Sequence, residues 1–216
     1  IKPAPMQKDS AGTWSVTIPP VAPGIYSYVF SVDGVQTVDK ANPVTKSGTE
    51  LYSSIVEVPG ERPRFDEVQN VPHGVKQLVR YTSTPLRRLR AMTIYLPPQY
   101  EAHPAEKFPV LYLRHGGGDD ETSWSQPAGR ADIILENLLA AQEAVPMIIV
   151  MTNGLTDGTW AGGSTPEGMK ALEEELLSDV IPMVEHRYRV KKQAGARAIA
   201  GLSMGGGQSF VIGLRH

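Results

Sequence analysis

Apolar and polar side chains alternate along the first part of the chain, with the two-residue period of a β-strand that buries one face. An Asp33-Gly34 pair separates two of these runs by the two residues that a tight hairpin turn needs. The pattern therefore predicts an all-β domain over residues 1–58. The alternating runs cover residues 14–18, 26–32 and 35–38, and a closing strand covers residues 51–58.

The pattern changes after this β-rich part. Residues 59–74 are rich in proline, glycine and polar side chains and show no period, which predicts a linker. His73 is interpreted as part of that linker rather than as a catalytic residue. Further along, strand patterns alternate with helical ones, which predicts an α/β domain over residues 75–216.

The α/β part begins with a hairpin and continues as a series of strands and helices. The run at residues 109–114 is continuously apolar up to Leu113, as in a strand buried on both faces of a sheet. Pro182 is expected to kink or restart the second helix. The order strand, helix, strand, helix, strand predicts a doubly wound, mostly parallel sheet. The hairpin covers residues 77–83 and 88–96, the later strands 109–114, 147–152 and 197–202, and the helices 129–143 and 168–188.

The strand at residues 197–202 runs straight into a Gly-x-Ser-x-Gly sequence with Ser203 at its centre. This arrangement holds a serine on a tight strand-to-helix turn, with its hydroxyl pushed out of the sheet. The chain can double back only if the residues two before and two after the serine carry no bulky side chain, and Gly201 and Gly205 meet that demand. Ser203 is therefore the candidate nucleophile, and the backbone N–H of Met204 is a candidate oxyanion donor.

A second glycine-rich loop, His115-Gly116-Gly117-Gly118, directly follows the strand at residues 109–114. An acyl-transfer enzyme needs a second N–H for the oxyanion, and glycines let the main chain come close enough to supply it. Gly117 or Gly116 is the expected donor, and His115 is expected to shape the loop. The acidic residues at positions 119–121 are interpreted as solvated or capping, since no histidine accompanies them at metal-ligand spacing.

Composition narrows the classes of function. The chain has 216 residues, 41% hydrophobic and 20% charged, with a net charge of −2, so neither nucleic acid nor an anionic membrane is an expected partner. It has no cysteine, which excludes disulfides, thiol catalysis and cysteine-bound metals. No apolar run reaches transmembrane length. The first residues show no signal-peptide pattern, so an exported form is expected to have lost its signal already.

The β-rich part resembles the immunoglobulin-like early-set domain of carbohydrate-binding module family 48. The resemblance implies a small β-sandwich over residues 1–58, and it implies that the first strands of that domain are missing. The aromatic stripe of Tyr26, Tyr28 and Phe30 is interpreted as core packing and an inter-domain face rather than as a platform for sugar. The resemblance is carried by residues 13–20, 23–34 and 39–43.

Residues 75–216 resemble the Putative esterase family of α/β-hydrolases, most specifically in the loop at residues 115–124 and the glycine-rich turn at residues 201–206. This family includes the feruloyl and acetylxylan esterases of carbohydrate esterase family 1, esterase D and the enterochelin esterases. The resemblance implies an α/β-hydrolase fold and a serine esterase that needs no cofactor or metal. Trp124 and Trp160 are candidates for walls of the acyl or sugar pocket, with loop anchoring as the alternative.

Joined to the early-set domain, this resemblance implies a secreted or periplasmic feruloyl or acetyl esterase. Its partners would be plant cell-wall polysaccharide esters of xylan or small feruloylated oligosaccharides, and its oligomeric state is left open. An enterochelin-type siderophore esterase is the alternative, which would favour a cationic pocket, and Arg114 is the only basic residue expected near the site. A non-catalytic carbohydrate-binding protein on a decayed esterase fold is the alternative of another class.

The catalytic acid and base are expected outside this chain. In α/β-hydrolases the triad follows the order Ser, Asp or Glu, His, and 13 residues follow Ser203. None of the five histidines occupies the place of the family base, so none is given that role. We therefore expect an esterase domain that is incomplete at its C-terminus, with its acid and base supplied beyond residue 216.

Overall fold

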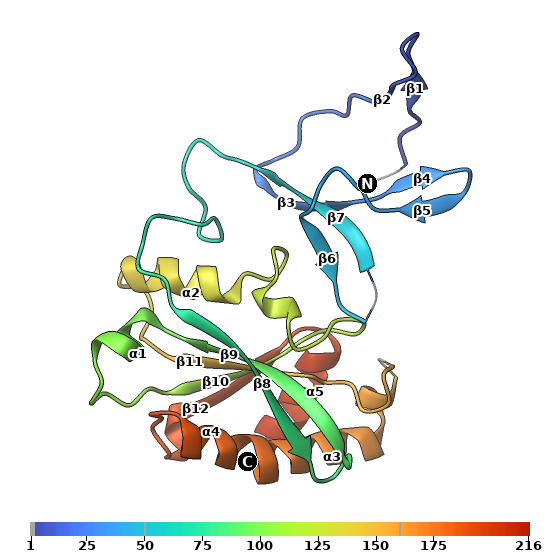
Figure 1. Cartoon of the computed structure of the whole chain (residues 1–216). Helices are drawn as coiled ribbons and strands as arrows, with labels where there is room; N and C mark the ends of the chain where they lie inside the picture. The colour runs from blue at the N-terminus through green and yellow to red at the C-terminus, as the bar shows by residue number, and fades with distance from the viewer. Residues whose placement is uncertain (1–2, 50, 160) are drawn as a thin grey trace.

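The structure is a computed structural model and describes residues 3–49, 51–159 and 161–216. Figure 1 shows a region of short strands, coloured blue to cyan, beside a region in which helices pack on a larger sheet. We call residues 3–58 the β region and residues 75–216 the α/β region.

One five-stranded sheet organises the α/β region. Its strands are β8 (Val75–Ser83), β9 (Arg88–Leu96), β10 (Val110–Arg114), β11 (Ile148–Thr152) and β12 (Arg197–Gly201). They lie in the order β12-β10-β11-β9-β8, and β10 is parallel to both β11 and β12. β9 is antiparallel to β11 and forms a hairpin with β8, so the sheet is mixed. The predicted hairpin and the strands that follow it are confirmed.

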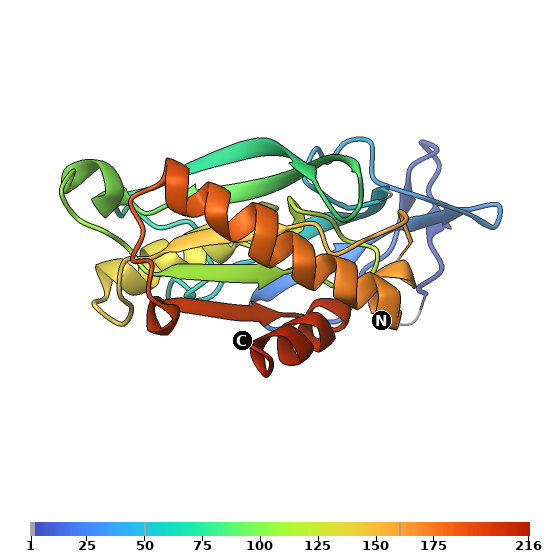
Figure 2. The same ribbon diagram turned by 90° about the horizontal axis from the view of Figure 1, so that it is seen from below.

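Helices cover both faces of this sheet (Figure 1, Figure 2). They are α1 (Pro98–Ala102), α2 (Ala131–Ala140), α3 (Pro166–Glu175), α4 (Ile181–Arg187) and α5 (Met204–Gly213), with 3-10 turns at Ser123–Ser125, Gly162–Ser164 and Ala194–Ala196. α2 lies on one face, over a cluster that includes Leu113 and Leu135. The segment from α3 to α4 lies on the other face with α5, over a cluster that includes Ile94 and Val184. Within the described residues, no helix combines the length and apolar character needed to cross a membrane.

The second predicted helix, residues 168–188, contains one widened turn. α3 passes into a π-helical turn at Leu176–Val180 and then into α4. Pro182 lies in the first turn of α4, directly after the π turn. A proline lacks the N–H of a regular α-helix, and its ring conflicts with the preceding turn. The π turn accommodates the proline, so the helix continues where a kink or restart was expected.

The β region contains three small sheets. β1 (Gln7–Lys8) pairs with β2 (Trp14–Ser15), β4 (Phe30–Val32) pairs with β5 (Val35–Thr37), and β3 (Gly24–Tyr28), β7 (Leu51–Val58) and β6 (Thr45–Ser47) form a sheet in that order. Asp33 and Gly34 have φ of 52° and 82°, which confirms the predicted hairpin turn. The strand predicted at residues 14–18 is wrong beyond Ser15, because its partner β1 is only two residues long.

Residues 59–74 form neither a helix nor a strand, and they pack along α2. The Asn137 side chain donates to the carbonyls of Phe65 and Glu67, both at 2.8 Å. His73 Nδ1 lies 2.6 Å from the Glu136 carboxylate. These contacts tie the predicted linker to the α/β region over much of its length.

Candidate active site

Ser203 lies on the turn between β12 and α5. Its backbone has φ 51° and ψ −114°, a conformation that costs a non-glycine residue about 1–3 kcal/mol. Close main-chain approaches hold the turn. A Cβ at Gly201 would collide with the carbonyl of Gly205, and a Cβ at Gly205 would lie 2.5 Å from the carbonyl oxygen of His115. Both glycines are therefore required, and the serine side chain is left exposed at the tip of the turn.

α5 begins at Met204, directly after the serine. Gly207 N donates to the Ser203 carbonyl at 3.0 Å, which is the first hydrogen bond of this helix. The N–H of Met204 belongs to the first turn, where N–H groups have no acceptor inside the helix. These N–H groups and the positive end of the helix dipole lie next to Ser203 and favour negative charge there.

The second glycine-rich loop makes a tight turn from Gly116 to Asp119. Asp119 N donates to the Gly116 carbonyl at 3.3 Å, and Gly118 has φ 83°, the left-handed conformation that suits glycine. Gly117 is exposed and lines the same cleft as Ser203, so the structure brings these two predicted site residues together. The cleft has a volume of ≈ 450 Å³, and its other lining residues are Lys46, Tyr52, Gly118 and Asp119.

His115 joins the loops that follow β10 and β11. Its Nε2 accepts a hydrogen bond from Gly154 N at 2.8 Å, so Nδ1 carries the proton and donates to the Gly116 carbonyl at 2.8 Å. Burial lowers the pKa of His115 and keeps the ring neutral. With both ring nitrogens engaged, His115 shapes the loop.

Arg114 is buried behind the nucleophile turn. Its side chain is 1% exposed and donates to Gln208 Oε1 at 3.2 Å, and Gln208 Nε2 donates to the carbonyls of Gly154 and Gly163, both at 2.9 Å. Burial lowers the pKa of Arg114 to about 10. The expectation that Arg114 is the only basic residue near the site is wrong, because Arg114 faces inward and Lys46 of β6 lines the cleft.

Of the two candidate tryptophans, Trp124 lies within the described residues. The indole N–H of Trp124 donates to the Arg114 carbonyl at 2.9 Å, and its ring packs against the cluster around Leu113 and Leu135. These are the contacts of a loop anchor, and a place for Trp124 in the pocket wall stays a prediction. Trp160 lies outside the described residues.

The acidic residues after the glycine loop have separate partners. Asp119 pairs with Lys46 at 3.4 Å, and Glu121 accepts a hydrogen bond from the Asn153 side chain at 2.8 Å. Asp120 accepts from Thr122 N at 2.8 Å, which is a local cap. Across the described residues, no group of three or more ligand side chains is arranged to hold a metal ion.

Comparison with known families gives this site its context. A family profile described as "Putative esterase" matches residues 83–216, more than half of the chain. The chain belongs to this esterase family. A curated relative, the endo-1,4-beta-xylanase/feruloyl esterase of Xylanibacter ruminicola, is 33% identical over 98% of this chain, which spans 30% of that protein.

Solved esterase structures share the fold. A ferulic acid esterase is 34% identical to this chain, with a TM-score of 0.60 over 68% of this chain and 57% of its own. The enterobactin esterase of Shigella flexneri matches 100% of this chain and 60% of its own with a TM-score of 0.72, and at 17% identity that likeness is one of fold alone. The expected α/β-hydrolase-like fold is confirmed. The chain spans less than two thirds of the length of each of these relatives.

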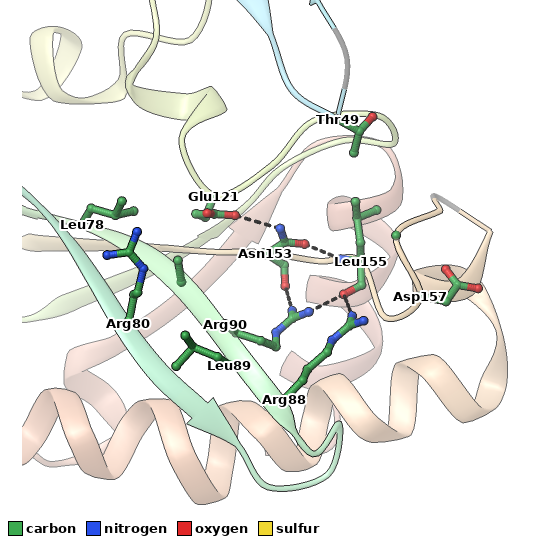
Figure 3. A pocket seen from close by; sticks show the side chains of 12 residues that line it. Thr49, Leu78, Arg80, Arg88, Leu89, Arg90, Glu121, Asn153, Leu155 and Asp157 are labelled. Carbon is green, nitrogen blue, oxygen red and sulfur yellow. Dashed lines mark hydrogen bonds between the residues drawn. The ribbon is translucent and has the colours of Figure 1, made fainter.

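A second pocket, with a volume of ≈ 560 Å³, could not be predicted from the sequence (Figure 3). Arg88 and Arg90 of β9 line it and donate to carbonyls of the loop after β11, including Leu155, which accepts from Arg90 at 2.6 Å. Exposed Arg80 lines it from β8. The lining residues come from separate segments, and the only local signal is the Arg-Arg-Leu-Arg run at residues 87–90.

Proposed function

We propose that this chain supplies the nucleophile and the oxyanion hole of a serine carboxylic-ester hydrolase, a feruloyl or acetyl esterase that acts on plant cell-wall xylan. The observation that carries the proposal is Ser203, held in a strained turn and lining one cleft with Gly117. The names of the relatives support the substrate class, since the Xylanibacter protein is named a xylanase/feruloyl esterase and the similar structure a ferulic acid esterase.

The proposed reaction is a two-step acyl transfer. Ser203 Oγ attacks the ester carbonyl carbon while its proton passes to a general base, and the N–H groups of Met204 and of Gly116 or Gly117 hold the oxyanion. The bond to the sugar alcohol then breaks, and the alcohol leaves with the proton from the base. Water attacks the acyl-enzyme in the same way and releases the carboxylic acid. The acid and base of the triad are proposed to come from residues outside this stretch, and no cofactor or metal takes part.

The chain is proposed to consist of two domains joined by a linker. Residues 1–58 would be an early-set domain like that of carbohydrate-binding module family 48, residues 59–74 a linker, and residues 75–216 a domain of carbohydrate esterase family 1. Short strands and the Asp33-Gly34 hairpin turn support the first assignment. Because a cell-wall polymer lies outside the cell, the protein is proposed to be secreted or periplasmic. Its partners are proposed to be such polymers or small feruloylated oligosaccharides.

The proposal is tested by covalent labelling and turnover in the full-length protein that carries this chain. A fluorophosphonate should add once, and methyl ferulate should be hydrolysed. Ser203→Ala should abolish the adduct and lower kcat on the order of 10⁴- to 10⁶-fold. Ser31→Ala, which changes an exposed serine of β4, is the matched control and should retain both. An adduct that persists in Ser203→Ala, or a wild type without turnover, would contradict the proposal.

A siderophore esterase is the second candidate, because positive side chains line both pockets. Lys46 lines the cleft itself, and Arg80 and Arg88 line the second pocket. Such side chains suit an anionic catecholate ester. Faster turnover of a catecholate triester than of methyl ferulate would favour this candidate. A non-catalytic sugar-binding protein would instead bind xylo-oligosaccharides equally well in wild type and Ser203→Ala, with no ester turnover in either.

A further inference from the structure

The hairpin of β6 and β7 reaches from the β region to the glycine loop of the active site (Figure 1). The Gly118 carbonyl oxygen accepts a hydrogen bond from the Tyr52 hydroxyl at 2.6 Å and from Thr49 N at 3.0 Å. The Thr49 hydroxyl lies 3.0 Å from the same oxygen and 2.8 Å from the Tyr52 hydroxyl. One carbonyl of the loop is therefore held by donors from a segment about 70 residues earlier in the chain.

The two segments approach too closely for side chains larger than that of glycine. A Cβ at Gly118 would lie 2.9 Å from the Tyr52 hydroxyl. A Cβ at Gly48 would collide with the Gly118 carbonyl and lie 2.9 Å from Asp119 Cα. Two further contacts flank this approach: the Lys46–Asp119 ion pair, and the hydrogen bond from Ser47 N to Gln126 Oε1 at 3.1 Å.

The loop needs such an anchor because three consecutive glycines follow His115. Glycine loses more backbone entropy on ordering than any other residue, so a free triple-glycine turn samples many orientations of its N–H groups. An oxyanion hole stabilises the transition state only when its donors are already oriented. Anchoring the Gly118 carbonyl restricts the turn that carries the Gly116 and Gly117 N–H groups, and Gly117 lines the cleft with Ser203.

We propose that Tyr52 and Thr49 are positioning residues of the esterase, which hold the glycine turn in the conformation that presents its N–H groups to the oxyanion. The inference rests on the proposed function, and it adds the β6–β7 hairpin to the active site. Tyr52 also lines the cleft, with Lys46. The β region thus serves the chemical step, in addition to any binding of sugar.

The test compares tyrosine hydroxyls in the full-length protein. Tyr52→Phe keeps the ring and removes the donor to Gly118. It should lower kcat for methyl ferulate about 10- to 100-fold, with KM changed less than about threefold, because the contact acts mainly in the transition state. Thr49→Val should have a smaller effect in the same direction, since Thr49 N still donates. Tyr26→Phe is the matched control, because the Tyr26 hydroxyl donates to the Ala22 carbonyl in the β region at 2.8 Å and should leave kcat unchanged.

A purely structural role would give a different result. In that case Tyr52→Phe would have a lower Tm than Tyr26→Phe, and its activity would fall only in proportion to the loss of folded protein. An unchanged kcat per folded molecule would therefore overturn the inference. Wild-type kcat in both Tyr52→Phe and Thr49→Val would overturn it as well. In both cases a wild type labelled at Ser203 would leave the proposed function standing. A wild-type protein that shows neither labelling nor turnover would contradict both the proposed function and this inference.

Discussion

Two isoleucines show how differently the two regions bury apolar side chains. Ile94 of β9 is fully buried in the cluster that includes Val184 of α4, whereas Ile18 of the β region is 48% exposed. Among the described residues of the β region, Ile55 is the only apolar side chain that is buried, and Val35 at the hairpin is 67% exposed. The α/β region therefore holds the nucleophile by its own packing. The β region contributes through the points at which it contacts the α/β region.

The largest expected effect comes from a close main-chain approach at the nucleophile turn. Gly205→Ala would place a methyl group 2.5 Å from the His115 carbonyl oxygen. This oxygen is a main-chain atom, so it cannot move aside as the end of a flexible side chain would. We expect a loss of about 3 kcal/mol or more in the free energy of unfolding, measured by urea denaturation. Gly195→Ala is the control, because its new methyl group would meet no atom within 4 Å beyond its chain neighbours, and its change should stay within about 0.5 kcal/mol. Equal effects would refute the argument from close approach.

The next expected effect compares the burial of one isoleucine in each region. Ile94→Ala should cost about 2–5 kcal/mol in the free energy of unfolding, because it removes buried methyl groups and leaves a cavity. Ile18→Ala removes the same atoms from a half-exposed site and should cost less than about 1 kcal/mol. Denaturant midpoints of the two variants measure the difference. A cost at Ile18 as large as that at Ile94 would show that the β region buries its apolar residues in solution.

The smallest expected effect concerns pH. The pKa of His115 in the folded protein lies below its ordinary value of 6.5, chiefly through burial. The unfolded chain therefore binds the proton first as pH falls, and folding stability decreases below about pH 6.5, by at most about 1.4 kcal/mol per pH unit. Nearby Asp119 and Asp120 reduce this shift, and Arg114 adds to it.

A pair of variants isolates the His115 contribution. His115→Gln keeps a donor and an acceptor but does not titrate, so its unfolding free energy should be flatter between pH 7 and pH 5 than that of the wild type. His103→Gln, at an exposed histidine, should keep the wild-type slope. An unchanged slope in His115→Gln would assign the pH dependence to other groups.

Much of the α/β region was predictable because its signals are local. An apolar run such as residues 109–113 favours a strand buried on both faces, and the Gly-x-Ser-x-Gly sequence favours a strand, a turn and a helix start within a few residues. The Asp33-Gly34 turn was predictable for the same reason, since both residues tolerate positive φ. Each of these features depends on neighbours in sequence.

The features that sequence reasoning missed depend on contacts between distant segments. Lys46 and Tyr52 reach the cleft of Ser203 from another region, and no local pattern marks either residue. Arg114 is the last residue of β10 and looked like a site residue, but Gln208, almost a hundred residues later, keeps it inside. At residues 16–18 the alternation was present, yet none of the described strands pairs with them. Alternation identifies a strand only when a partner exists.

The π turn ahead of Pro182 also has a consequence for how this chain can change in evolution. Leu172, Leu176, Val180 and Val184 are all buried at four-residue intervals. In a regular α-helix, each such interval would rotate the side chain by about 40° around the axis, away from the sheet. The wider turn reverses part of that drift. A π turn holds one residue more than an α turn, so deleting one residue there would restore an ordinary helix and leave the direction of the segment after it nearly unchanged. An alignment would record such a deletion as a single gap, while the layer behind the nucleophile would keep its buried face.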